Sequence, residues 1–188
     1  MSLSKISASN SLRRGNIGII PTDTIYGLAG QALKRQTVER IYKVRKRSPD
    51  KPLIILISSI DDLKLFGIRP DHKTLQILDK YWPGQVSIIL PCAYKKFTYL
   101  HRGTNSLAFR FPAKTGLLEI LDQTGPLVAP SANPEGSEPA ENIAAAREYF
   151  GDRIDFYYGS GRLQSPPSTL IRIEKGKVEV LREGAVKI

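Results

Sequence analysis

Cysteine, histidine and long apolar runs are scarce in this sequence, and each scarcity excludes a class of structure. Cys92 is the only cysteine, which excludes an internal disulfide framework, and with two histidines a structural zinc site is not expected. No run approaches the roughly 18 apolar residues that a membrane-spanning helix needs, and the first residues lack the apolar centre of a secretory signal. We therefore expect a cytoplasmic protein without a membrane partner, in which any cofactor metal is held by oxygen ligands.

Positive charge, in contrast, is abundant. The 188 residues contain 28 Lys and Arg against 18 Asp and Glu, which gives a formal net charge of +10. This surplus favours an anionic partner such as a nucleotide, a phosphate or RNA, but it also fits a basic, soluble surface with no specific ligand. The length, with 41% hydrophobic residues, predicts that residues 1–188 form one domain with a real core.

Hydrophobic periodicity predicts the elements of that domain. Short apolar runs bounded by Gly or Pro predict strands at residues 17–20, 53–57, 86–90 and around Leu127. Helical periodicity marks residues 37–46, 71–82 and 140–150, with a further short helix before Gly67. Near the end, STLIRI and VEVLRE, joined by EKGK, predict an antiparallel hairpin. The fold class is therefore α/β, with a single-domain, twisted, mixed parallel and antiparallel sheet flanked by helices.

The run from residue 107 to residue 111 alternates in character. Leu107, Phe109 and Phe111 fall on one face of the predicted strand, whereas Ala108 and Arg110 fall on the other. One face of this strand is therefore free for a site.

The segment PTDTIYGL, residues 21–28, directly follows a predicted buried strand. Its two threonine hydroxyls and one aspartate can hydrogen-bond a small polar ligand, and Gly27 permits close approach of a ligand to the backbone. Taken alone, the segment favours an ordinary turn in which Thr and Asp side chains satisfy local backbone groups.

Cations cluster in KVRKRSPDKPL, residues 43–53, immediately before another predicted strand. Several cationic groups converging from one wall suit a triphosphate, and Pro49 with Pro52 fixes them in a shaped loop. The alternative is a solvated basic helix end, where cations interact favourably with the helix C-terminus.

A third polar segment, GPLVAPSANPEGSEPA, covers residues 125–140. Ser131 and Asn133 follow a predicted buried strand and precede a glycine-containing loop, so hydroxyl, amide and backbone N–H groups can face a ligand together. No G-x-S-x-G elbow surrounds Ser131, which argues against a covalent serine nucleophile.

These segments occur in a fixed order with several others: PTDTIYGL, KRSPDKPL, WPGQVSIIL, LAFRFP, APSAN, STLI and LREG. From about Gly15 to Ala185 the order resembles the YrdC/TsaC family of threonylcarbamoyl-AMP synthases, in a short single-domain form. The resemblance implies a YrdC-like fold that makes threonylcarbamoyl-AMP and pyrophosphate from L-threonine, bicarbonate and ATP, with Mg²⁺ present. The product would serve the threonylcarbamoyladenosine (t6A) modification of tRNA, with the transfer-complex proteins of that pathway as partners.

The resemblance also assigns roles by motif position, with Arg110 pairing with the threonine carboxylate in a bidentate fork. The residues expected to contact threonine are Thr24, Arg110, Ala129 and Ser168. Those expected to face ATP are Arg47, Lys51, Ser106, Ser131, Asn133 and Arg182. Those expected to support catalysis by positioning and charge stabilisation are Arg45, Arg47, Ser131 and Asn133. No residue is assigned to a metal.

One motif position departs from the family. Its usual Lys-x-Arg before Pro-x-x-Lys-Pro-Leu has Arg45 in the lysine position here, and Lys43 fills that role only if the helix end shifts. Side chains two residues apart diverge by about 200° on a helix. Because Arg45 and Arg47 can then reach one ligand only beyond a helix end, we predict that the helix ends near Arg45.

Two other functions remain open at this point. The first is a double-stranded RNA or tRNA binding module of the same fold, for which a basic concave face would supply phosphate contacts. The second is a paralogous enzyme that handles another carbamoyl-adenylate. A pocket at Thr24, Arg110 and Ser168 that recognises a free amino acid would distinguish the synthase from the paralogous enzyme, and tight RNA binding without an ATP-dependent product would favour the binding module.

Overall fold

The computed structural model describes residues 4–174 and 176–188. The strands are β1 (Gly18–Pro21), β2 (Tyr26–Gln31), β3 (Ile54–Leu56), β4 (Val86–Pro91), β5 (Ser106–Arg110), β6 (Leu127–Val128), β7 (Phe156–Tyr157), β8 (Thr169–Glu174) and β9 (Lys177–Arg182). They form one nine-stranded sheet in the order β7-β1-β2-β6-β3-β5-β4-β8-β9. The pairs β1–β7, β3–β5 and β4–β8 are parallel, and the other neighbouring pairs are antiparallel. The predicted mixed sheet is confirmed.

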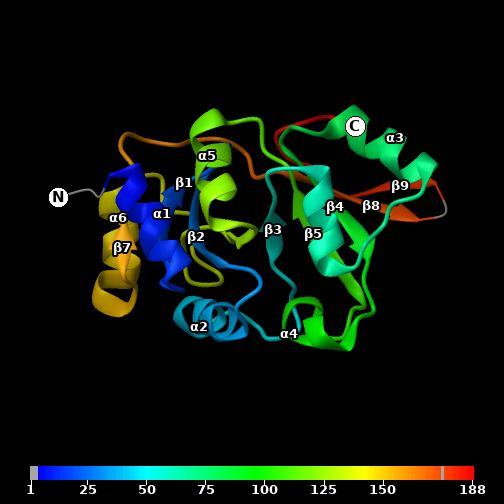
Figure 1. Ribbon diagram of the computed structural model, residues 1–188. Coiled ribbons are helices and arrows are strands. Elements are labelled where there is room, and N and C mark those ends of the chain that lie inside the picture. Colours follow the sequence, from blue (N-terminus) through cyan, green and yellow to red (C-terminus); the bar gives the residue numbers. More distant parts are fainter. Residues whose placement is uncertain (1–3, 175) are drawn as a thin grey trace.

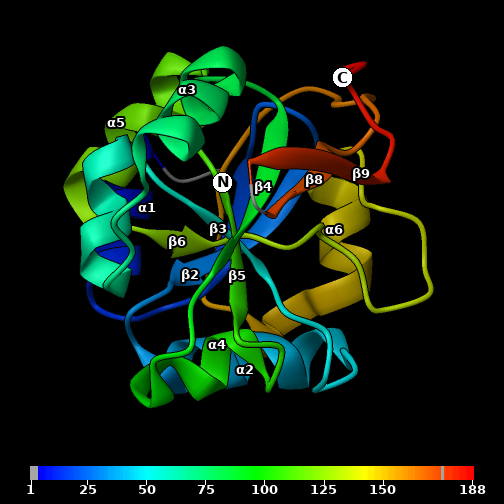
Figure 2. The ribbon, with the colours of Figure 1, turned by 90° about the vertical axis from the view of Figure 1, so that its right-hand side faces the viewer.

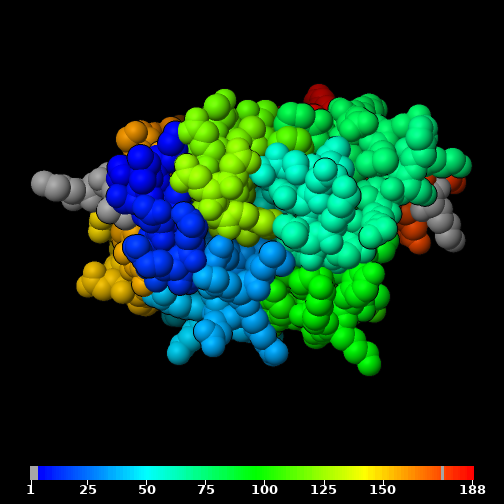
Figure 3. All heavy atoms as spheres, in the orientation of Figure 1, coloured from blue at the N-terminus to red at the C-terminus, as the bar shows by residue number. Residues whose placement is uncertain are grey.

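Helices cover this sheet on both faces. The α-helices are α1 (Lys5–Arg13), α2 (Arg35–Arg45), α3 (His72–Tyr81), α4 (Thr98–His101), α5 (Thr115–Thr124) and α6 (Ile143–Phe150). Short 3₁₀ helices are η1 (Ile60–Phe66), η2 (Lys95–Phe97) and η3 (Gly151–Arg153). Figure 1 and Figure 3 show α1 and α5 side by side over the part of the sheet that contains β1 and β2. In Figure 2, α6 lies on the opposite side of the sheet from these two helices.

The strands divide their apolar side chains between two core clusters. Ile55 belongs to the cluster that includes α2 and α6, whereas its neighbour Leu56 packs with α1 and α5. Ile19 and Ile20 are divided in the same way. Because successive side chains of a strand point to opposite faces, a strand covered on both faces is a continuous apolar run. This explains why LIILI and IGII identify strands from the sequence.

The sequence pattern identified most of the sheet but not all of it. The hairpin of β8 and β9 is confirmed, with Ile173 opposite Val178, and Lys175 of its turn lies outside the described residues. The strand β2 was not predicted, because YGLAGQ is rich in small residues that favour strands weakly. A side chain at Gly30 would collide with Thr37 of α2, so β2 needs glycine there for the helix to pack closely. The Ser-rich α1 and the helix α5 were not predicted either.

Within residues 4–174 and 176–188, no helix is both long enough and apolar enough to cross a membrane.

Candidate functional site

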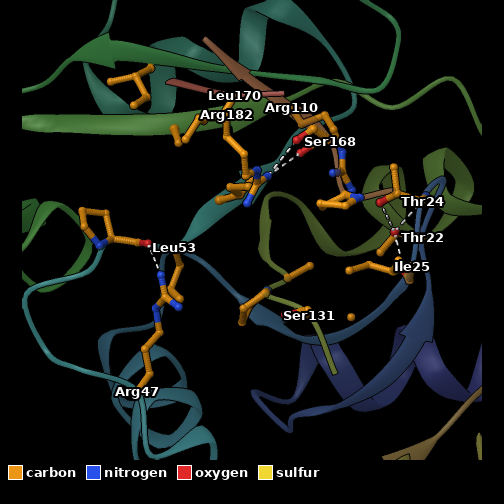
Figure 4. A pocket seen from close by; sticks show the side chains of 18 of the residues that line it. Thr22, Thr24, Ile25, Arg47, Leu53, Arg110, Ser131, Ser168, Leu170 and Arg182 are labelled. Carbon is orange, nitrogen blue, oxygen red and sulfur yellow. Dashed lines mark hydrogen bonds between the residues drawn. The ribbon is translucent and has the colours of Figure 1, made fainter. Parts of the chain in front are cut away.

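A cavity of about 530 Å³ opens over the centre of the sheet (Figure 4). Part of its wall is a row of residues that face one another across four strands. In register, Ile54 of β3, Ala108 of β5, Ile89 of β4 and Arg172 of β8 pair one after the other, and all line the cavity. This part of the cavity wall is therefore built on four hydrogen-bonded strands.

The two-residue period of β5 places its side chains as predicted. Ser106, Ala108 and Arg110 line the cavity, while Leu107 and Phe109 are buried in the core. Similarly, Ser168, Leu170 and Arg172 line the cavity at every second position. The face of the strand that the sequence left free for a site is the face on which the cavity lies.

The turn between β1 and β2 supplies the hydroxyl groups of PTDT. The Thr22 hydroxyl donates to the Ile25 carbonyl oxygen at 2.6 Å and accepts from the Thr24 backbone N–H at 3.2 Å. The Thr22 and Thr24 hydroxyls are themselves 3.2 Å apart, and both residues line the cavity. Lys114 holds this turn from outside by donating to the Thr22 carbonyl oxygen at 3.0 Å. The turn is therefore both locally satisfied and directed at the cavity.

The helix α2 ends at Arg45, as predicted, because Lys46 adopts a left-handed conformation with φ of 51°. Arg45 is 2% exposed. Its Nε donates to the Asn133 carbonyl oxygen at 2.8 Å and its Nη2 to the Ser131 hydroxyl at 3.1 Å. Its Nη1 is buried without a hydrogen-bond partner among the described residues, which leaves one charged donor for a ligand.

Arg47 reaches the cavity from the loop that follows the helix. Its Nε donates to the Lys51 carbonyl oxygen and its Nη2 to the Pro52 carbonyl oxygen, both at 3.1 Å. Lys51 itself is turned to a different partner, because its Nζ lies 2.5 Å from Glu135 Oε1. The left-handed turn thus separates Arg45 from Arg47 and lets both line one cavity.

The loop that carries Ser131 is fixed to β2. Gly27 forms a β-bridge with Ser131, and the backbone N–H of Ala132 donates to the Tyr26 carbonyl oxygen at 2.9 Å. Asn133 is buried, and its amide group donates to the carbonyl oxygens of Pro134 and Ser137. Asn133 therefore shapes the loop from within.

At the end of the cavity beside the PTDT turn, Arg110 forms an ion pair with Asp23. Arg110 Nη2 lies 2.9 Å from Asp23 Oδ1, and the two side chains are 5% and 6% exposed. Arg110 Nε is buried and has no hydrogen-bond partner in the described part of the chain. The ion pair with Asp23 therefore orients this guanidinium without using all of its donors.

A second arginine lies close to this pair. Arg182 of β9 donates from Nη2 to the Ser168 carbonyl oxygen at 2.7 Å (Figure 4), and the Ser168 hydroxyl lies 2.8 Å from the Ser87 hydroxyl. Ser168 and Ser87 are both buried. Arg182 of the LREG motif therefore lies over the start of β8, at the first residue of this strand face that lines the cavity.

The charged side chains that line the cavity are all positive. The arginines that line it are Arg45, Arg47, Arg110, Arg172 and Arg182. No Asp or Glu of the described residues lines it. Burial, together with the charge of Arg47, lowers the pKa of Arg45 to about 10. Burial also lowers the pKa of Arg110 and of Arg182. Charges that are disfavoured in this way are stabilised by a bound anion.

Most residues predicted from the sequence meet at this cavity. Those that line it are Thr24, Arg45, Arg47, Ser106, Arg110, Ala129, Ser131, Ser168 and Arg182. Lys51 and Asn133 are not among the described residues that line it. Lys43, the other possibility for the lysine position of the motif, is exposed and does not line it either.

Two polar residues of the lining, Thr104 and Arg172, were not predicted, whereas Thr22 is the other threonine of the PTDT segment. Thr104 carries a hydroxyl group, and Arg172 adds a charge. Arg172 could have been found from the alternation that begins at Ser168, since it lies four residues further along the same strand face. Thr104 has no comparable signal, because it lies in the turn before β5.

The comparisons with known proteins agree with this geometry. A model for Sua5, YciO and YrdC proteins, described as "Telomere recombination", matches residues 10–184. The chain belongs to the Sua5/YciO/YrdC family. The threonylcarbamoyl-AMP synthase of Marinobacter nauticus is 32% identical over 174 residues, which cover 90% of this chain and 91% of that protein. The threonylcarbamoyl-AMP synthase of Pyrococcus abyssi is 28% identical over 183 residues, and the match covers 96% of this chain but only 54% of that protein.

Solved structures of the family show the same fold. Pyrococcus abyssi Sua5 complexed with L-threonine has a TM-score of 0.85 at 27% identity, over 98% of this chain and 56% of that one. Escherichia coli YciO also has a TM-score of 0.85, at 21% identity, over 97% of this chain and 90% of that one. The chain thus spans about half the length of the Sua5 relative and most of YciO.

Proposed function

We propose that the chain is a nucleotidyltransferase that forms threonylcarbamoyl-AMP and pyrophosphate from L-threonine, bicarbonate and ATP. The observation that carries this proposal is the charge of the cavity. Arginines and hydroxyl groups line it, and no carboxylate of the described residues does. Such a wall suits a polyphosphate and a carboxylate in one site. The names of the relatives support it, since several are called threonylcarbamoyl-AMP synthase, and Sua5 was solved with L-threonine.

The two ends of the cavity suggest how the substrates divide it. In Figure 4, Arg47 lies on one side and Thr24, Arg110 and Ser168 lie on the other. Threonine would occupy the latter end, where Arg110 would pair with its carboxylate and Thr24 would contact its polar groups. Asp23 already pairs with Arg110 Nη2, so the carboxylate would use the remaining donors of the guanidinium. The phosphates of ATP would extend toward Arg45 and Arg47.

The reaction asks the protein for positioning and charge. The amine of threonine captures bicarbonate as a carbamate with loss of water, and the carbamate oxygen forms a bond to the α-phosphorus of ATP while the bond to pyrophosphate breaks. No protein nucleophile is needed. Arginine donors that are fixed in place stabilise the charge that develops on the phosphate oxygens and on the leaving pyrophosphate. Ser131 accepts a hydrogen bond from Arg45, which suits a role in orientation.

Magnesium would enter with its nucleotide as MgATP. Within residues 4–174 and 176–188, no group of three or more His, Cys, Asp or Glu side chains is arranged to hold a metal ion. Phosphate oxygens are good ligands for Mg²⁺, which commonly keeps several water molecules. A cavity lined by cations and hydroxyls is therefore compatible with a metal held by the substrate.

The proposed activity also implies a pathway, partners and a cellular location for the protein. Its product is an activated group for the t6A modification of tRNA, so proteins that transfer this group would be its partners, and the reaction would take place in the cytoplasm. Weak RNA binding that is sensitive to salt would accompany the net charge of +10.

Pyrophosphate release from MgATP tests the activity directly. With saturating bicarbonate, release should depend on L-threonine, and serine should be a poorer substrate because it lacks the methyl group. Release that is the same without an amino acid would contradict the proposal. Carbamoyl phosphate replacing threonine and bicarbonate would instead indicate the paralogous chemistry.

A further inference from the structure

Glu135 joins the two loops that flank the cavity. Its carboxylate accepts a hydrogen bond from the Ser48 backbone N–H at 2.6 Å and lies 2.5 Å from Lys51 Nζ. Its own backbone N–H donates to the Arg45 carbonyl oxygen at 2.9 Å. One residue of the loop between β6 and α6 is thus attached to the last residue of α2 and to two residues of the segment that follows it.

These attachments lead to residues that line the cavity, although Glu135 itself is not among its described lining residues. Arg47 is held by the carbonyl oxygens of Lys51 and Pro52, and Glu135 holds that same segment through Ser48 and Lys51. The hydrogen bonds from Lys51 and Ser48 lower the pKa of the Glu135 carboxyl, so it is ionised at neutral pH. Movement of the segment would carry the Arg47 guanidinium with it.

We propose that Glu135 is a positioning residue of the nucleotide end of the cavity. Its carboxylate fixes the 46–52 segment so that Arg47 faces the phosphates, and it holds Lys51 at the rim. A loop that is fixed before the ligand arrives loses less conformational freedom on binding, which increases affinity. The inference rests on the proposed function, because it takes MgATP as the ligand of this end.

The position of Glu135 predicts that its loss affects one ligand and not the other. Glu135 acts on the loop that carries Arg47, whereas Thr24, Arg110 and Ser168 lie on the other side of the cavity (Figure 4). Loss of the carboxylate should therefore weaken MgATP binding and leave threonine binding unchanged. A residue that only stabilised the fold would affect both ligands through the folded fraction.

Two substitutions remove the contacts in steps. In Glu135→Gln the amide oxygen can still accept from the Ser48 N–H, but the ion pair with Lys51 is lost. Glu135→Ala removes both contacts. The matched control is Glu138→Gln, which removes the same charge from an exposed position of the same loop.

Calorimetric titration with MgATP and with L-threonine, and hydrogen exchange of residues 46–53, test the inference on the full chain. We expect the Kd of MgATP to rise about threefold in Glu135→Gln and about tenfold in Glu135→Ala. The 46–53 amides should exchange faster in both variants, the Kd of threonine should stay constant, and Glu138→Gln should match the unmodified chain. In a Lys51→Met background, Glu135→Gln should have a smaller effect than in the unmodified chain.

Several results would overturn the inference. Glu135 variants that bind MgATP like the Glu138→Gln control would show that the carboxylate positions nothing. Tighter MgATP binding would show instead that Glu135 competes with the nucleotide for Lys51. Equal loss of threonine and MgATP affinity would indicate a general loss of folded protein. An unmodified chain that does not bind MgATP would refute the proposed function as well, so the two failures are distinguishable.

Discussion

Replacing Arg45 with methionine tests whether this buried guanidinium serves the ligand or the fold. The side chain is 2% exposed, donates to the Asn133 carbonyl oxygen and to the Ser131 hydroxyl, and keeps Nη1 without a partner in the described structure. Methionine has a similar length and flexibility but no charge, so it fills the space without burying a cation. Arg45→Met therefore removes the charge and its hydrogen bonds with little change in packing.

The effects on stability should largely offset one another. Burial and the charge of Arg47 together lower the pKa of Arg45 to about 10. At about 1.4 kcal/mol per pKa unit, keeping this group charged costs the folded state about 3 kcal/mol. The two hydrogen bonds from the charged group each contribute about 1.5 to 3 kcal/mol. The free energy of unfolding should therefore change by no more than about 3 kcal/mol, which corresponds to a Tm shift of up to about 12 °C.

The affinity for MgATP should fall as well. A phosphate that loses a charged donor in a partly buried site loses about 1.5 to 3 kcal/mol, so the Kd of MgATP should rise about 10- to 100-fold. Thermal unfolding and calorimetric titration of the same samples measure both quantities. Lys43→Met, which removes the same charge from an exposed position of α2, should change neither. A large loss of Tm with an unchanged Kd would show that Arg45 serves the fold and not the ligand, as a structural link between two loops.

Three further predictions follow from single contacts. A Cβ at Gly184 would overlap the Pro167 carbonyl group, so Gly184→Ala should lower the free energy of unfolding by about 1 to 3 kcal/mol in a denaturant titration, whereas Gly116→Ala, which meets open space, should not. Arg110→Met leaves the buried carboxylate of Asp23 unpaired and should cost about 3 to 5 kcal/mol, most of which the added Asp23→Asn should restore; a double variant as unstable as the single one would contradict this. The Kd of MgATP should rise steadily with salt concentration, since cations dominate the cavity lining, and a Kd independent of salt would argue against charge-driven binding.

The parts of the site that the sequence predicted are those set by local periodicity. The alternation of residues 107–111 placed Arg110 on the open face of β5, and the divergence of neighbours on a helix located the end of α2 at Arg45. Both follow from backbone geometry over a few residues. The mixed sheet was predictable for the same reason, because its strands are short apolar runs between turn residues.

The parts that were not predicted depend on contacts between distant segments. Nothing near Lys51 in the sequence indicates that it pairs with Glu135, 84 residues away. The pairing of Arg110 with Asp23 is equally invisible, although it decides how many donors remain for a substrate carboxylate. The strand β2 was missed because its small residues are selected by close packing against α2.

Mass spectrometry of a reaction with MgATP, L-threonine and isotopically labelled bicarbonate would identify the product itself. We expect a labelled threonylcarbamoyl-adenylate that forms together with pyrophosphate and is absent when threonine or ATP is omitted. Protein that binds MgATP and threonine but forms no labelled adenylate would overturn the proposed function, and so would an adenylate that carries no carbon from bicarbonate.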